Sequence, residues 1–305
     1  MMNARICSDG GFRLEGLPNG WQVGRFAVLE ALGVAHLVTT RQGPDVQQVR
    51  RDPATPGREI AQVLGLQSVA FLEQVHGGAV LECTQGGRAG AADGLVTAAF
   101  GLALLGKSGD CPIILIADRS RRAVGFAHAS WRATVAGIAP AVVHRMIDLG
   151  CDPGDLVACI CPSVGPCCYE VGDEVRTAAI QEIGPHAASF FRLAARPWLS
   201  PRRPELVGQG ADRLDGRRAA GAETLPSVPE AQERRAAAAG DRRLHFDLWR
   251  ANTCALARAG LVAQAIHVAG VCTRCRPDLF PSRRYEGEAA GRFAAVIGWV
   301  PPSPE

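Results

Sequence analysis

The chain has 305 residues, enough for one large domain or two small ones. Hydrophobic residues make up 47% of the chain, which is ample for a sizeable buried core. The net charge of +3 is close to balance, so neither a nucleic acid nor a membrane surface is indicated as a partner. No apolar run reaches the length of a membrane span, and the first residues lack the apolar segment of a signal peptide. We therefore expect a cytoplasmic protein.

Hydrophobic patterning predicts alternating strands and helices along most of the chain. The first 70 residues are strand-rich with one short helix, and 33–40 has the β-branched content of a strand. Further strands are predicted at 111–118, 123–128, 156–160, 262–271 and 293–299, and helices at 131–149, 169–183 and 247–259. Hairpins occur among these alternating elements. The pattern therefore favours an α/β (α+β) fold, a layered sandwich with mixed β-sheets flanked by helices.

Residues 196–243 differ in composition from the rest of the chain. They are rich in Arg, Ala, Gly and Pro, and their apolar periodicity is weak. Pairs of arginines in this stretch could touch RNA, but a solvated segment is the favoured interpretation. We expect a flexible insertion at 196–243 within a single domain that spans 1–305, and we expect the core to fold without it.

Eleven cysteines is a high number, but it is odd and the chain is too long for a small disulfide scaffold. Most are expected to be reduced. Cys272 and Cys275 have zinc-ribbon spacing, but no second Cys-x-x-Cys pair exists to complete such a site. Cys167 and Cys168 follow Gly165-Pro166 and are predicted to lie in a tight turn with a structural role.

Two histidines and one cysteine are the strongest candidates for chemistry. Cys111 opens the strand predicted at 111–118 and His128 closes the strand predicted at 123–128. An antiparallel hairpin would place both at the same edge of the sheet, and His76 lies in a turn. Two imidazoles and one thiol can hold a zinc ion with its fourth position open. The same residues can also act without metal, as a thiolate with histidine bases.

Several ordered motifs carry a resemblance to a known family. They lie at residues 74–77 (Gln-Val-His-Gly), 92–97, 109–111, 128–133, 161–172, 247–249, 272–273, 282–284 and 291–292. Together they resemble the multicopper polyphenol oxidase (laccase) domain family, whose members are now usually identified as purine nucleoside phosphorylases. Ser130 and Ala133 replace glycines of the family pattern, and Gly109 and Cys161 also depart from it. The three candidate ligands are intact, so we expect an altered pocket wall around a retained site.

The resemblance implies a purine nucleoside phosphorylase that acts on adenosine- or inosine-type nucleosides with phosphate, with adenosine deamination as a further activity. His76, Cys111 and His128 would be the catalytic residues and the ligands of a zinc ion. The residues expected to contact substrate are Asp110, Arg132, Tyr169, Arg283 and Arg284. The arginines would hold phosphate by paired hydrogen bonds, Tyr169 would stack on the base, and Asp110 would orient a histidine through its ring nitrogen.

Three alternatives stay open. One is a cysteine- or metal-dependent hydrolase with Cys111 as nucleophile, in line with the family's proposed link to peptidoglycan precursor editing. Another is a copper polyphenol oxidase, which seven histidines and no His-x-His pair make less favoured. The last is a scaffold with a vestigial site. The expected partners are a purine nucleoside and phosphate, and the chain is expected to be a monomer or a homodimer.

Overall fold

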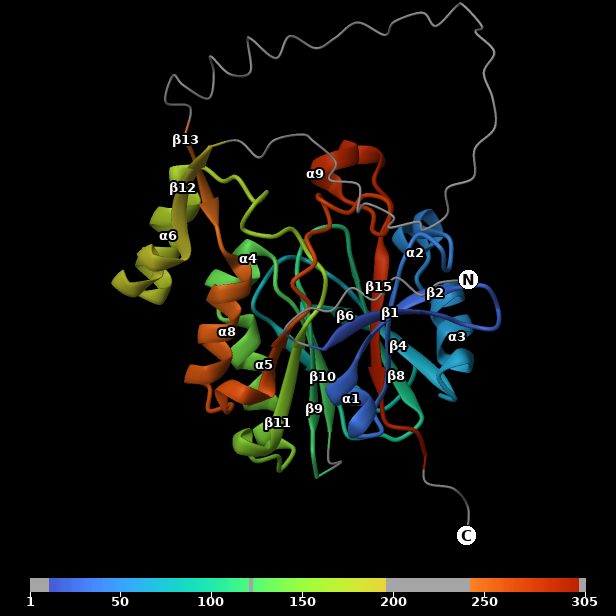
Figure 1. Cartoon of the computed structure of the whole chain (residues 1–305). Coiled ribbons are helices and arrows are strands. Elements are labelled where there is room, and N and C mark those ends of the chain that lie inside the picture. The colour runs from blue at the N-terminus through green and yellow to red at the C-terminus, as the bar shows by residue number, and fades with distance from the viewer. Residues whose placement is uncertain (1–10, 121–122, 196–241, 302–305) are drawn as a thin grey trace, which may run out of the picture.

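The computed structural model of the chain describes residues 11–120, 123–195 and 242–301. Two mixed β-sheets form its centre, and helices cover their outer faces (Figure 1). The predicted fold class, a layered α/β sandwich, is therefore confirmed.

The larger sheet has seven strands within the described residues, and the other sheet has six. The larger sheet runs in the order β1 (Phe12–Gly16), β2 (Gln22–Phe26), β3 (Ala35–Thr39), β15 (Phe293–Gly298), β8 (Leu102–Ser108), β4 (Ser68–Glu73) and β6 (Gly87–Ala91). The smaller runs in the order β14 (Ile266–Val268), β11 (Leu156–Ile160), β9 (Ile113–Asp118), β10 (Val124–His128), β7 (Gly94–Thr97) and β5 (Val80–Glu82). A separate pair is formed by β12 (Phe191–Ala195) and β13 (Arg242–Phe246).

Helices lie on both sides of the paired sheets. The α-helices are α1 (Ala27–Ala31), α2 (Val46–Arg51), α3 (Ala54–Val63), α4 (Trp131–Val135), α5 (Ile138–Asp148), α6 (Asp173–Ile183), α8 (Leu248–Arg258) and α9 (Arg283–Glu286). Short 3₁₀ turns are η1 (Pro153–Asp155), η2 (Pro185–Phe190), η3 (Ala263–Ala265) and η4 (Gly287–Ala289). Figure 1 shows α5 and α8 on one side of the sheets and α2 and α3 on the other. In the part of the chain that is described, none of these helices has the length and apolar character needed to cross a bilayer.

The main core lies between the two sheets. Phe126 of β10, Phe293 of β15 and Leu104 of β8 are fully buried in one cluster. A second cluster joins the smaller sheet to α5, where Ile114 packs with Val142. Burial of β9 and β10 on both faces explains why their sequences are continuous apolar runs rather than alternating ones.

The predicted hairpin is confirmed. Strands β9 and β10 pair antiparallel, and His128 lies directly opposite Ile113. Cys111 therefore precedes the first paired residue of β9 at the same sheet edge where β10 ends. This register brings residues 17 positions apart in the sequence to one place.

Several predicted boundaries were wrong. The helix predicted at 131–149 is two helices, because Gly137 adopts a positive φ of 78° between α4 and α5. The helix predicted at 169–183 begins only at Asp173, because Val171 donates its backbone N–H to Leu244 of β13. The strand predicted at 262–271 is limited to β14, preceded by η3. Residues 11–70 hold three α-helices, α1 to α3, where the sequence predicted one.

The insertion predicted at 196–243 includes two residues that the structure places in a strand. Arg242 and Arg243 belong to β13 and pair with β12, and the rest of the predicted insertion, 196–241, lies outside the described residues. Ala195 and Arg242 are partners in the ladder, so their backbones are adjacent.

We expect the core to fold when residues 196–241 are replaced by a two-residue Asn-Gly turn. The ends that the turn must join are cross-strand partners, and a two-residue hairpin turn spans that gap. Thermal unfolding of this variant should stay cooperative, with a midpoint within a few degrees of the full chain. Insoluble protein or a broad transition in circular dichroism would contradict the prediction.

We expect acid to destabilise the protein through His36. Its Nε2 accepts the backbone N–H of Phe26 at 2.9 Å and its Nδ1–H donates to the carbonyl of Val34 at 3.0 Å. Burial and the charge of Arg25 lower the pKa of His36 to about 4, although its hydrogen bond to Val34 raises it. His36 of the unfolded chain therefore becomes protonated as the pH falls below about 6.5, whereas His36 of the folded chain stays neutral until about pH 4. Stability is present above about pH 6.5 and is lost as the pH falls toward 4.

Urea unfolding of the wild type and of His36→Gln at pH 7 and pH 4.5 measures this effect. The wild type should lose about 2 kcal/mol more than the variant, because glutamine has no proton to take up. An equal loss in both proteins would show that His36 does not carry the acid sensitivity.

Candidate functional site

His76, Cys111 and His128 converge, as predicted. One ligand atom from each lies within 4.8 Å of the others. The two imidazole rings lie edge to face, with centroids 4.9 Å apart. His76 is exposed, Cys111 is half-buried and His128 is buried, so the group opens from the protein interior toward solvent.

The turn that carries His76 is held from both ends. The side-chain amide of Gln74 donates to the carbonyl of Lys107 at 2.8 Å and its oxygen accepts the Lys107 N–H at 2.9 Å. The backbone N–H groups of Val75 and Gly77 both donate to Oδ2 of Asp93, at 3.2 and 2.6 Å. His76 itself has a positive φ of 64°, which is uncommon for a residue with a side chain. Such strain persists only where surrounding contacts impose it, and it is frequent at functional sites.

Asp93 also orients His128. Its Oδ1 lies 2.7 Å from Nδ1 of His128, and its backbone carbonyl accepts the His128 N–H at 2.7 Å. With Nδ1 engaged, Nε2 is the nitrogen left to face Cys111. A carboxylate behind a histidine in this way is the usual second layer of a histidine metal site. Asp93 is fully buried, and it serves both histidines at once because its other oxygen holds the His76 turn.

The prediction that Asp110 orients a histidine was wrong. Its Oδ1 accepts the hydroxyl of Thr273 at 2.7 Å, and its Oδ2 accepts the backbone N–H of Arg284 at 2.8 Å. Asp110 therefore ties the loop before β9 to two segments near the C-terminus. Its φ of 147° places a second strained residue beside the site. Burial raises the pKa of this carboxyl despite these hydrogen bonds.

Hydrogen bonds shift the pKa values of Cys111 and His128 in opposite directions. Burial raises the pKa of the Cys111 thiol, but hydrogen bonds from His128 and His76 outweigh it and lower the pKa to about 6. Burial lowers the pKa of His128, but hydrogen bonds to Asp93 and Cys111 raise it to about 9. Near neutral pH, these two shifts favour a thiolate on Cys111 and an imidazolium ion on His128, with the Asp93 carboxylate behind it.

The residues suggested for substrate contact lie at different depths. The Arg284 guanidinium lies 4.6 Å above the centroid of the buried Tyr169 ring. The backbone of Arg284 is the one that donates to Asp110. Arg283 is exposed and forms an ion pair with Glu288. Arg132 is exposed and lies over the ring of its neighbour Trp131.

Two further cations, Lys107 and Arg292, lie near the His76, Cys111 and His128 group, and neither was predicted from the sequence to contact substrate. Burial lowers the pKa of Lys107, and so does the charge of Arg292. Burial and the charge of Arg50 lower the pKa of Arg292, against the charges of Cys111 and Asp110. Arg292 belongs to the matching motif at 291–292, whose family resemblance was the available signal.

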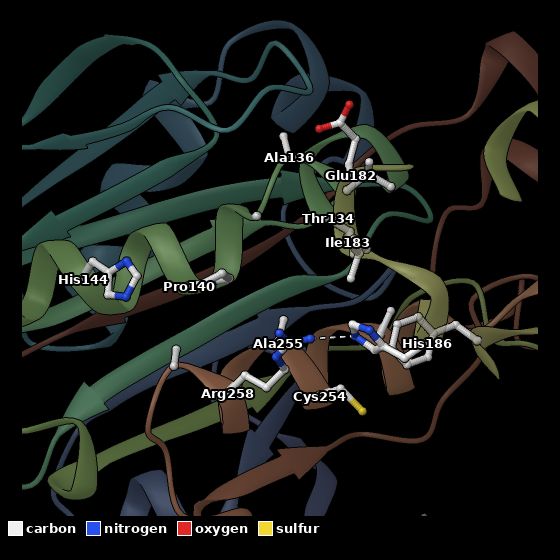
Figure 2. Close-up of a pocket in the computed structure, with 15 residues that line it drawn as sticks. Thr134, Ala136, Pro140, His144, Glu182, Ile183, His186, Cys254, Ala255 and Arg258 are labelled. Carbon is white, nitrogen blue, oxygen red and sulfur yellow. Dashed lines mark hydrogen bonds between the residues drawn. The ribbon is translucent and has the colours of Figure 1, made fainter. Parts of the chain in front are cut away.

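A hollow of about 420 Å³ lies elsewhere, between α5, α6 and α8 (Figure 2). Arg258 and His186 both line it, and their Nη1 and Nε2 atoms lie 2.7 Å apart. None of the three convergent residues lines it. It is therefore a separate feature from the candidate site.

The donor set at the candidate site fits a zinc ion. Zinc takes imidazole nitrogen at about 2.0–2.1 Å and thiolate sulfur at about 2.3 Å, and catalytic sites keep three protein ligands and one open position. Two histidines and a cysteine with atoms within 4.8 Å meet that requirement after small side-chain shifts. In the described part of the chain, a second group that could hold a metal ion consists of four cysteines, Cys167, Cys168, Cys272 and Cys275.

Residues 39–201 and 218–300 match the model of a family described as multi-copper polyphenol oxidoreductase laccase. The match covers well over half of the chain and includes all three convergent residues. The chain belongs to this family.

Relatives in the family carry a different activity in their names. A protein of Geobacillus stearothermophilus named purine nucleoside phosphorylase YlmD is 30% identical over 84% of this chain and 82% of its own length. A purine nucleoside phosphorylase of Deinococcus radiodurans is 28% identical over 88% of this chain and 90% of its own length. The crystal structure of the hypothetical protein YfiH of Bacillus licheniformis shares the fold. Its TM-score is 0.69 at 24% identity, with 94% of this chain and 98% of that chain covered.

Proposed function

We propose that this protein is a purine nucleoside phosphorylase that acts on adenosine- or inosine-type nucleosides. The observation that carries the proposal is the convergence of His76, Cys111 and His128 in a chain that matches relatives of that name over most of its length. The proposed reactants are therefore a purine nucleoside and inorganic phosphate.

The reaction replaces one bond at the anomeric carbon with another. A phosphate oxygen bonds to C1′ of the ribose, the bond from C1′ to the purine nitrogen breaks, and the purine leaves with a proton. The sugar passes through an oxocarbenium-like state, so the enzyme must hold phosphate against C1′ and supply a proton to the base. A zinc ion, when bound by the three residues, would supply a Lewis acid at the open position.

The residues of this chain divide into those two tasks. His76 is exposed at the mouth of the group, where its imidazole can donate a proton to the departing purine. Arg284, whose guanidinium lies over the Tyr169 ring, and Arg292 can hold phosphate by charge-assisted hydrogen bonds. The ring of Tyr169 offers an apolar face for a base. Arg283 and Arg132 are also exposed and are assigned to the approach of phosphate.

A second candidate is a hydrolase. A thiol that accepts hydrogen bonds from two imidazoles also has the geometry of a cysteine nucleophile with its base. In that case, water rather than phosphate would be the second substrate. Copper oxidase chemistry is less favoured, because the described residues gather two histidines at this group and four cysteines at the other.

The reactions separate in a single set of incubations. Purified protein is mixed with adenosine or inosine, with and without phosphate, and the bases and nucleosides are resolved by chromatography. The proposal predicts free adenine or hypoxanthine in the phosphate-containing samples alone. Free base without phosphate would select the hydrolase, and oxygen uptake in a separate incubation with a phenol would select the oxidase. Inosine formed from adenosine with or without phosphate would add deamination as a further activity.

A further inference from the structure

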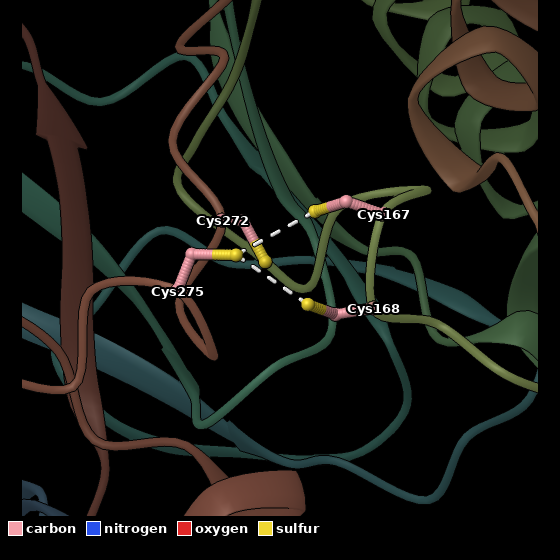
Figure 3. Close-up of side chains that lie close together, drawn as sticks. All are labelled: Cys167, Cys168, Cys272 and Cys275. Atoms are coloured by element: carbon pink, nitrogen blue, oxygen red, sulfur yellow. Dashed lines mark hydrogen bonds between the residues drawn. The ribbon is translucent and has the colours of Figure 1, made fainter. Parts of the chain in front are cut away.

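Four cysteines from two distant turns meet outside the site described above. Cys167 and Cys168 lie in the turn after β11, and Cys272 and Cys275 lie in the turn after β14. Their sulfur atoms all lie within 4.8 Å of one another, and Figure 3 shows the four side chains converging on one point. The sequence pattern Cys-x-x-Cys had no second Cys-x-x-Cys partner, because its partner is a pair of adjacent cysteines.

The spacing of the sulfur atoms matches that around a tetrahedral metal ion. Sγ of Cys275 is 3.7 Å from Sγ of Cys167 and 3.4 Å from Sγ of Cys168. Four sulfurs bound to zinc at about 2.3 Å stand about 3.8 Å apart. A disulfide requires about 2.05 Å, and one sulfur cannot bond to both partners. The arrangement therefore favours a shared ion over a cross-link.

The surroundings stabilise negative sulfur. The backbone N–H of Gly165 donates to Sγ of Cys272 at 3.2 Å, and Nη1 of Arg274 lies 3.7 Å from Sγ of Cys168. Both contacts offset the charge of four thiolates, which carry a net charge of −2 once Zn²⁺ is bound. Cys168 and Cys272 are buried whereas Cys167 and Cys275 are exposed, so an ion can enter from solvent.

We propose that Cys167, Cys168, Cys272 and Cys275 bind one Zn²⁺ ion as a structural tetrathiolate site. The four thiols lose their protons as the ion binds. Closed sites with four cysteines are structural, because they leave no position for water or substrate.

The zinc would fix one wall of the candidate active site. Tyr169 follows Cys168 directly, and Thr273 follows Cys272 and donates to Asp110 at 2.7 Å. Apart from one isolated bridge, between Ser163 and Cys272, the two turns lie outside the named strands. An ion shared by all four cysteines would hold Tyr169 and Thr273 at a fixed separation.

Metal content of the purified full-length chain tests the proposal. Zinc is measured per chain by inductively coupled plasma mass spectrometry in a Cys111→Ala background, which removes a ligand of the other group. We expect one zinc per chain, and none after the further change Cys272→Ser with Cys275→Ser. Cys83→Ser with Cys254→Ser is the matched control, because both of these half-buried cysteines lie outside the cluster, and it should keep its zinc. Chelation should lower the thermal midpoint of the control and leave that of the cluster variant unchanged.

The single exposed change Cys275→Ser provides a milder test if the double variant does not fold. It should reduce zinc retention during dialysis against a chelator, whereas Cys275→His, which restores a zinc ligand, should recover it. Zinc retention by Cys275→Ser equal to that of the parent would overturn the proposal. The proposal would also be overturned if the mass of the parent protein were two hydrogens too low because two of the four cysteines form a disulfide. Iron bound in place of zinc would overturn it as well. None of these readouts depends on phosphorolysis.

Discussion

Replacing Cys111 with alanine is expected to abolish turnover and leave the fold intact. The thiol contributes the one sulfur among three converging donors, and both imidazoles hydrogen-bond to it. Loss of an outer partner of such a site costs about 10–100-fold, so loss of a central member should cost at least about 100-fold in kcat/KM. Initial rates of base release from inosine measure the change, and circular dichroism checks the fold.

Cys83→Ala is the matched control, because this half-buried cysteine lies outside both groups. It should keep the wild-type rate. Full activity of Cys111→Ala would contradict the zinc site and the cysteine nucleophile together, because each requires this sulfur.

Replacing Asp93 with asparagine is expected to cost about 10–100-fold in kcat/KM. Asp93 accepts on both oxygens, from His128 on one side and from the N–H groups of Val75 and Gly77 on the other. An amide has one acceptor oxygen, so either the histidine or the turn must face an NH₂ group. The unmatched buried donors should also lower the free energy of unfolding by about 1–3 kcal/mol.

Asp118→Asn separates the two effects. Asp118 is a fully buried carboxylate at the other end of β9 and accepts from the N–H of Ser120 at 3.1 Å. That variant should lose stability and keep its rate. If Asp93→Asn kept the wild-type rate while losing stability to the same degree, Asp93 would be a structural residue without a part in the site.

The part of the site that lies on the hairpin could be predicted because the pattern there is local. Two short apolar runs joined by a polar turn define β9 and β10, and the antiparallel register then brings Cys111 to His128. His76 needed more than local pattern, since its turn is placed by Gln74 and Asp93 through contacts between distant segments. The family motifs supplied that missing link.

Asp93 was missed as the partner of His128 because the two are 35 residues apart, with Asp93 in the bend before β7 and His128 at the end of β10. Asp110 was chosen instead because it adjoins Cys111 in sequence, but its side chain points to Thr273 and Arg284. Proximity in sequence is a poor guide to hydrogen bonding across a sheet edge.

Helix limits failed for a different reason. Apolar periodicity continues across Gly137, although the positive φ of that residue separates α4 from α5. The four-cysteine group was also hidden, because ligand-spacing rules search for repeated Cys-x-x-Cys pairs and this chain uses Cys167 and Cys168 side by side.

The sugar product formed from inosine and phosphate in oxygen-18-labelled water is the most direct test of the proposed function. Phosphorolysis joins a phosphate oxygen to C1′, so mass spectrometry should find ribose 1-phosphate without the label, in amounts equal to hypoxanthine. Cys111→Ala should form neither product. Free ribose that carries oxygen-18 would show that water attacks C1′, and it would contradict the assignment of this site to phosphorolysis.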